Sequence, residues 1–119
     1  MTLVLIAIGA ALGAPLRYLV DRSVTTRARG AAFPWGLFTV NVIGSAVAAV
    51  VLATTSGDLR LLLTVGLCGA FTTFSGFGWE ASRLWSTARG AFWATVIAMP
   101  LACTAAFLLA WSLAGAVSP

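Results

Sequence analysis

The sequence predicts an all-α integral membrane protein, and three observations support this fold class. The 119 residues are 61% hydrophobic and only 8% charged, whereas about a quarter of the residues in a soluble domain are charged. Four apolar stretches are each long enough to cross a bilayer as a helix, which takes about 20 residues. So few charges could not cover a small soluble protein without leaving broad apolar patches exposed. Lipid is therefore the expected solvent for this chain.

The four transmembrane helices are expected at about residues 2–20, 34–53, 59–79 and 90–114. Pro34 suits the first turn of the second helix, where its missing N–H would be unpaired anyway. Pro100 lies inside the fourth stretch and predicts a kink there. The joining segments are too short for a second domain. Residues 1–119 are therefore expected to form a single four-helix transmembrane domain, with only a short tail at its C-terminus.

The arginines are distributed unevenly between the two sides of the membrane. An even number of spans places both termini on one side, so the charges of the loops can be compared. The segments after the first and third spans carry five arginines, and the opposite side carries one. Because positive charge favours the cytoplasm, residues 21–33 and 80–89 are expected to be cytoplasmic. The arginines form no run that could grip phosphates, so nucleic acid is not an expected partner.

The chain has few groups for proton or metal chemistry. It has no histidine, and its only acids are Asp21, Asp58 and Glu80, so we do not expect an enzyme. The main alternative function is a small four-helix proton-coupled multidrug exporter, which needs a titratable carboxylate in the membrane centre. Glu80 lies at a predicted span end, and no acid lies deep inside a span. Cys68 and Cys103 lie in apolar stretches and are expected to pack as free thiols.

Two polar residues lie where lipid disfavours them. Arg17 lies three residues from the end of the first span, after Gly9 and Gly13. It either snorkels to the interface beside a close helix contact, or turns inward to cap carbonyls or to set a positive potential near an anion path. Asn41 lies one turn into the second span, and its carboxamide needs partners for two N–H groups and an oxygen. It binds either a neighbouring helix or a ligand.

The third span is the least regular part of the sequence. Four glycines, two adjacent threonines and a serine within residues 66–80 make a poor continuous helix. We expect a break there, either as a glycine-rich packing seam or with freed carbonyls that could bind a cation. Phe71, Phe74 and Phe77 share a face on a helical path, and their ring edges could join neutral donors in holding a small anion. The candidate donors are Thr73, Ser75 and Asn41.

Three ordered motifs within residues 9–80 carry a resemblance to a known family. They are Gly9-x-x-x-Gly13-Ala-x-x-Arg17-Tyr18 in the first span, Gly36-x-x-Thr39-Val-Asn41-x-x-Gly44-Ser45 in the second, and Gly66-Leu-Cys-Gly69-Ala-Phe-Thr72-Thr73-Phe74-Ser75-Gly76-Phe77 in the third. In order and spacing the motifs resemble those of the CrcB/Fluc family of fluoride channels. The motif of the third span is close to the family signature G-F-C-G-G-x-T-T-F-S-T-F. Gly76 stands where this signature has threonine.

The resemblance implies a fluoride-selective channel in the cell membrane that passively exports fluoride from the cytoplasm and relieves fluoride toxicity. It also implies an antiparallel, dual-topology-type dimer with two fluoride pathways. A structural sodium ion (Na+) at the dimer centre would be held by backbone carbonyls at the breaks in the third helices. Gly69 and Thr72 match the positions that supply those carbonyls.

The resemblance also implies roles for individual side chains. Phe74 and Phe77 match the phenylalanines whose ring edges face the ion path, and Asn41 matches the pore asparagine. The other matches are Thr73, Ser75 and Glu80, which are implied to continue a polar track, and Arg17, which matches the family arginine.

The composition of the implied dimer stays open. A chain that inserts in both orientations should have nearly balanced loop charges, yet here the arginines are divided five to one. The chain either forms a dual-topology homodimer despite this bias, or has a fixed orientation and pairs with an oppositely oriented homologue.

Overall fold

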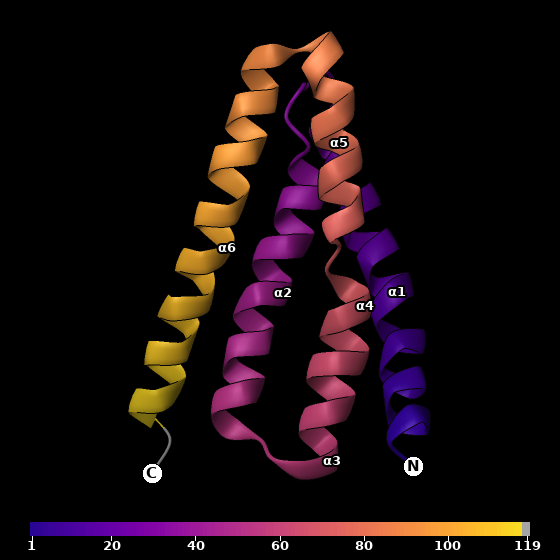
Figure 1. The fold of residues 1–119 in the computed structure, drawn as a ribbon, viewed down its shortest axis with the longest axis vertical. Coiled ribbons are helices and arrows are strands. Elements are labelled where there is room, and N and C mark those ends of the chain that lie inside the picture. Colours follow the sequence, from indigo (N-terminus) through magenta and orange to yellow (C-terminus); the bar gives the residue numbers. More distant parts are fainter. Residues whose placement is uncertain (118–119) are drawn as a thin grey trace.

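The computed structural model describes residues 1–117. Residues 118 and 119, which end the predicted domain and its tail, lie outside the described range. Within that range all regular secondary structure is helical (Figure 1). The helices are α1 (Thr2–Arg27), α2 (Trp35–Thr54), α3 (Gly57–Arg60), a π-helix (Leu61–Cys68), α4 (Gly69–Phe71), α5 (Phe74–Thr87) and α6 (Arg89–Val117). Four helical paths are long and apolar enough to cross a membrane, namely α1, α2, residues 57–87 and α6. The predicted all-α class with four membrane-spanning helices is confirmed.

The helices extend further than the apolar stretches that were expected to span the membrane. α1 continues to Arg27 and α5 to Thr87, and most of the two predicted loops is therefore helical. Polar residues continue these helices without strain. Thr87 Oγ1, for example, donates to the carbonyl of Arg83 (2.8 Å). Apolar composition marks the part of a helix that lies in lipid, whereas the helix itself continues as long as its backbone groups are paired.

α2 is the central helix of the fold. It packs along α6 and along α1, and α1 in turn packs along the π-helix and α4. α5 packs against α6. The start of α1 and the end of α6 lie at the same end of the molecule (Figure 1), as an even number of spans requires. Many large apolar side chains are exposed, which is the arrangement expected where lipid, rather than water, surrounds the helices.

Close contact between α1 and the third helical path depends on glycine. A Cβ on Gly9 would overlap the carbonyl oxygen of Leu62, and a Cβ on Gly13 would overlap the carbonyl oxygen of Leu67. Small residues at such crossings let two backbones approach closely, and van der Waals packing of this kind is a main source of helix association in lipid. The glycines of the first motif therefore have a packing role.

The third helical path is interrupted just after α4. Thr72 (φ −82°, ψ 161°) and Thr73 (φ −150°, ψ 120°) have extended backbones, and α5 begins at Phe74. The expected shared face of three phenylalanines is therefore wrong. Phe71 is 7% exposed and packs beside Gly44, whereas Phe74 is 84% exposed. Two extended residues redirect the chain, so a spacing of three no longer places side chains on one face.

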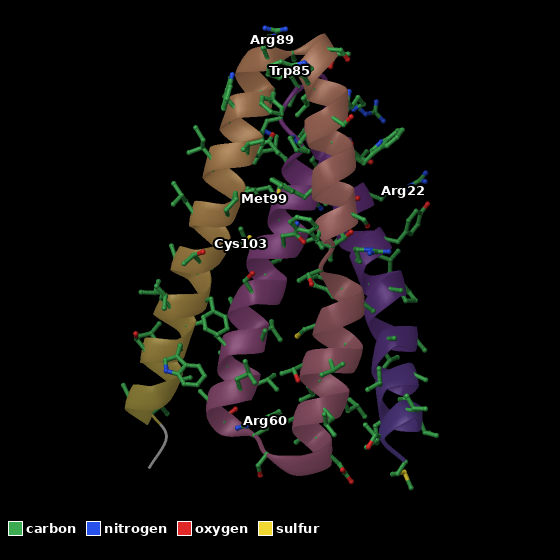
Figure 2. All side chains as sticks on the ribbon, viewed as in Figure 1. Arg22, Arg60, Trp85, Arg89, Met99 and Cys103 are labelled. Atoms are coloured by element: carbon green, nitrogen blue, oxygen red, sulfur yellow. The ribbon has the colours of Figure 1, made fainter. Side chains whose placement is uncertain are left out.

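The arginines are as uneven in space as in sequence. Figure 2 shows Arg22 and Arg89 toward the end of the molecule away from the termini, and Arg60 near the end that holds them. Arg60 Nε donates to the carbonyl of Thr55 (2.8 Å), and one of its terminal nitrogens donates to the carbonyl of Leu52 (2.9 Å). This arginine therefore satisfies carbonyls at the C-terminal end of α2, which a helix leaves unpaired.

Candidate functional site

A polar junction of Asn41, Thr73 and Met99 joins α2, the extended segment before α5, and α6. Its centre is the carboxamide of Asn41, which is 8% exposed. The amide oxygen accepts a hydrogen bond from the backbone N–H of Thr73 (2.9 Å), and the amide nitrogen donates to the carbonyl of Thr73 (3.2 Å). Asn41 therefore holds both backbone groups of one extended residue. This residue belongs to the extended segment between α4 and α5 and not to a helix, and a ligand on Asn41 stays a prediction.

Met99 completes the polar junction from α6. Asn41 Nδ2 lies 3.5 Å from the sulfur of Met99 and donates to it, and Met99 is 2% exposed. Figure 2 shows Met99 and Cys103 on successive turns of α6. Sequence reasoning missed Met99, because a thioether in an apolar span looks like ordinary packing. The only signal was its position as the one methionine inside a predicted span.

Thr73 also begins α5. Its Oγ1 accepts from the backbone N–H of Gly76 (3.0 Å) and lies 3.1 Å from the hydroxyl of Ser75, so it is an N-cap. Gly76, where the family signature has threonine, occupies a tight position. A Cβ there would lie 2.9 Å from the methyl group of Thr73 and 3.1 Å from Leu37. Glycine at this position leaves room for the cap.

Two cavities meet at Thr73. Cavity A has a volume of about 520 Å³ and is lined by α1, α2, α5 and the segment before α2. Cavity B has a volume of about 310 Å³ and is lined by α2, α6, α5 and the extended segment. Among residues 1–117, Thr73 is the only one that lines both cavities. A small ligand that passed from one cavity to the other would therefore meet this residue.

Cavity A holds the charged residues of the predicted site. Arg17 is half-buried and lines this cavity with Asp21, whose Oδ1 accepts a hydrogen bond from Thr25 (3.1 Å). Glu80 also lines it and lies inside α5, which continues past the predicted end of the third span. One carboxylate oxygen of Glu80 accepts two hydrogen bonds from Arg83 (2.7 and 3.2 Å). The negative charge of Glu80 is thus compensated at the cavity wall.

Cavity B holds two of the predicted aromatic residues. Phe74 and Phe77 both line it, with ring centroids 5.8 Å apart and ring planes inclined at 37°. Phe74 is 84% exposed and Phe77 is half-buried. The structure therefore brings these rings together with Asn41 and Thr73, and leaves Phe71 outside the site.

The positions expected to bind sodium lie just before the polar junction. The N–H and Oγ1 of Thr72 both donate to the carbonyl of Cys68 (2.9 Å each). Because the N–H of Thr73 donates to Asn41, it does not pair with the carbonyl of Gly69, four residues earlier. Within residues 1–117 no three histidine, cysteine, aspartate or glutamate side chains gather as a metal site. The backbone carbonyl oxygens at these positions are hard ligands of the kind that suit a hard cation such as Na+.

Four apolar helices around a polar junction define a multi-pass membrane protein. The chain belongs to the family described as "CrcB-like protein, Camphor Resistance (CrcB)", which matches residues 4–115. This match covers nearly the whole described chain.

The relatives found by comparison carry the name of an ion channel. A Fluoride-specific ion channel FluC 1 of Streptomyces avermitilis is 45% identical over 95 residues, covering 76% of each chain. A Fluoride-specific ion channel FluC of Chelativorans sp. is 42% identical over 114 residues, covering 91% of this chain and 88% of the relative. A third, from Koribacter versatilis, is 35% identical over 115 residues. An ion channel is not a class of enzyme, which agrees with the sequence prediction.

Proposed function

We propose that this protein is a fluoride-selective channel that lets fluoride leave the cytoplasm passively and so relieves fluoride toxicity. The observation that carries the proposal is the position of Thr73, which lines cavity A and cavity B and lies beside two phenylalanine rings. The fluoride channels among its relatives support the choice of ion.

The chemistry of the two cavities suits fluoride. This anion is small and strongly hydrated, so a pore must replace its water with close donors that still release it. Thr73 and Ser75, whose hydroxyls are neutral donors, line cavity A. Phe74 and Phe77 offer the positive edges of their rings in cavity B. Fluoride would leave the hydroxyls of Thr73 and Ser75 and meet these rings next.

The polar residues around this path would have different tasks. Both N–H groups of Asn41 have partners in the structure, so it donates to fluoride only when one of those hydrogen bonds exchanges. Arg17 would set a positive potential in cavity A without binding the ion tightly. Glu80 would extend the polar wall of that cavity while Arg83 compensates its charge.

The exposed part of the site supports an antiparallel dimer. Gly69, Phe74 and Ser75, which flank the extended residues Thr72 and Thr73, are exposed in the single chain. Irregular backbone at membrane depth persists only when protein or a polar cavity covers it. A second subunit would supply this cover and close cavity B. The backbone carbonyls of Gly69 and Thr72 would hold a structural sodium ion at the dimer centre.

The test of the function is fluoride efflux from liposomes that contain the purified chain, with chloride efflux as the control. We expect a leak of fluoride that far exceeds the leak of chloride. If neither the chain alone nor the chain with an oppositely oriented homologue releases fluoride selectively, the proposal is wrong.

Replacing Phe74 or Phe77 with isoleucine should suppress fluoride efflux while the protein still assembles. Isoleucine keeps the apolar volume but removes the positive ring edge. Phe107→Ile is the matched control, because Phe107 stacks on Trp111 away from both cavities and its loss should leave efflux unchanged. Efflux rates and elution profiles of all three variants can be compared directly. Unchanged efflux rates for the Phe74 and Phe77 variants would mean that these rings serve only in packing.

The orientation of the chain can be measured with an impermeant maleimide. A fixed orientation predicts that Ala31→Cys, at the end with five arginines, is protected in intact cells, while Ser56→Cys, in the opposite loop, is labelled. A dual-topology homodimer predicts equal labelling at both positions. We propose the fixed orientation, with an oppositely oriented homologue as partner, because the segments after the first and third spans carry five arginines and the opposite side carries one. Equal labelling would instead establish pairing with a second copy.

The structure does not favour the proton-coupled multidrug exporter. Such a transporter needs a titratable carboxylate that is free to exchange protons and substrate in the membrane. Glu80 is the acid next to the polar residues of the third path, and it is paired with Arg83 at 2.7 Å.

A further inference from the structure

α6 contributes a sulfur atom, and no oxygen, to the polar junction. Its threonine Thr95 is fully buried away from both cavities, and Ser112 Oγ donates to a carbonyl of its own helix (2.9 Å). Thr104 is exposed. The residues of α6 that line cavity B are Met99, Pro100 and Cys103. Of these, Met99 accepts a hydrogen bond from Asn41.

The carboxamide of Asn41 needs this sulfur because of how its other groups are used. The side-chain oxygen of Asn41 accepts from the N–H of Thr73, which turns the carboxamide toward that residue. One hydrogen of the side-chain NH₂ group then donates to the carbonyl of Thr73. The second amide hydrogen remains. It is buried, and a buried donor without a partner is costly. A thioether is a weak acceptor, but it is the one that the structure places within reach.

We propose that Met99 is a positioning residue. Its sulfur takes the second N–H of Asn41 and so keeps the carboxamide turned toward both backbone groups of Thr73. Because Thr73 caps α5 and lies between cavity A and cavity B, the sulfur of α6 fixes the geometry of the point where the cavities meet. This role gives the fourth span a task at the site, and its effect on transport rests on the proposed function.

The composition of the chain makes this role testable atom by atom. The chain has two methionines, Met1 and Met99, and Asn41 is its only carboxamide side chain. Growth of a methionine auxotroph on norleucine replaces the sulfur by a methylene group of nearly the same shape. Growth on selenomethionine keeps a soft acceptor atom at the same place. With ¹⁵N labelling, the side-chain NH₂ of Asn41 gives a single pair of resonances that reports its two hydrogen bonds.

We expect norleucine to shift the amide proton that faced the sulfur and to speed its exchange, while selenomethionine restores the native pair of resonances. Fluoride efflux should fall roughly two- to ten-fold with norleucine, the range for the loss of one weak hydrogen bond, and recover with selenomethionine. In a Met99→Leu variant only Met1 remains to be replaced by norleucine. Its Asn41 resonances and its fluoride efflux should be the same whether it is grown on methionine or on norleucine.

A packing role for Met99 makes the opposite prediction, because norleucine fills the same space. Unchanged Asn41 resonances in the norleucine protein would overturn the proposal, and so would a shift that selenomethionine fails to reverse. If the unmodified chain carries no fluoride, the proposed function fails. The Asn41 resonances still decide the role of Met99 in that case, since they are recorded without fluoride.

Discussion

Replacing Asn41 with alanine should reduce fluoride efflux by at least about ten-fold and also lower the thermal stability of the protein. The substitution removes the partners of both backbone groups of Thr73, and each unpaired buried group costs about 1–3 kcal/mol. The extended segment before α5 would lose its fixed conformation, and the hydroxyl of Thr73 would leave its place between the two cavities. Efflux from liposomes and unfolding followed by circular dichroism measure the two effects.

Thr39→Ala is the matched control for this substitution. Thr39 lies on the same helix, but its hydroxyl donates to the carbonyl of Trp35 in its own helix (2.8 Å). A hydroxyl satisfied in this way contributes little to contacts between helices, so efflux and stability should stay close to those of the unmodified protein. An Asn41→Ala protein with the same efflux as this control would show that the polar junction is not needed for transport.

Replacing Gly13 with leucine should prevent the native packing of α1. The new side chain would run into the carbonyl oxygen of Leu67, which belongs to a backbone that cannot rotate away. Overpacking typically costs about 1–3 kcal/mol where side chains can adjust, and a clash with backbone should exceed that range. We expect a large loss of folded protein after purification in detergent, measured by size-exclusion chromatography and thermal unfolding.

Gly115→Leu provides the comparison, because no heavy atom lies within 4 Å of a Cβ at that position on α6. Both substitutions add the same side chain to a helix, so intrinsic helix propensity changes equally. The Gly115 variant should therefore fold as well as the unmodified chain or slightly better. Similar stability of the two variants would mean that α1 and the third helical path can move apart without loss of stability, which contradicts the prediction.

The residue pattern predicted the parts of the site that are close in sequence. Thr73, Phe74, Ser75 and Phe77 lie within five residues, so any irregularity there must bring them together. The face of Phe71 was predicted wrongly, since a three-residue spacing carries meaning only on an uninterrupted helix. The helices continue past the predicted spans, because hydropathy reports the solvent around a helix and not the pairing of its backbone.

The sequence by itself determined the class of this protein: four apolar helices, few charges, five arginines against one, no histidine and only three acids. These properties follow from composition and local pattern, which the bilayer selects directly. Only the tertiary structure decided that Asn41 holds Thr73, that Met99 completes the polar junction, and that two cavities meet at one residue. Those contacts join residues 32 and 58 positions apart, and no periodicity links positions so distant until helix packing brings them together.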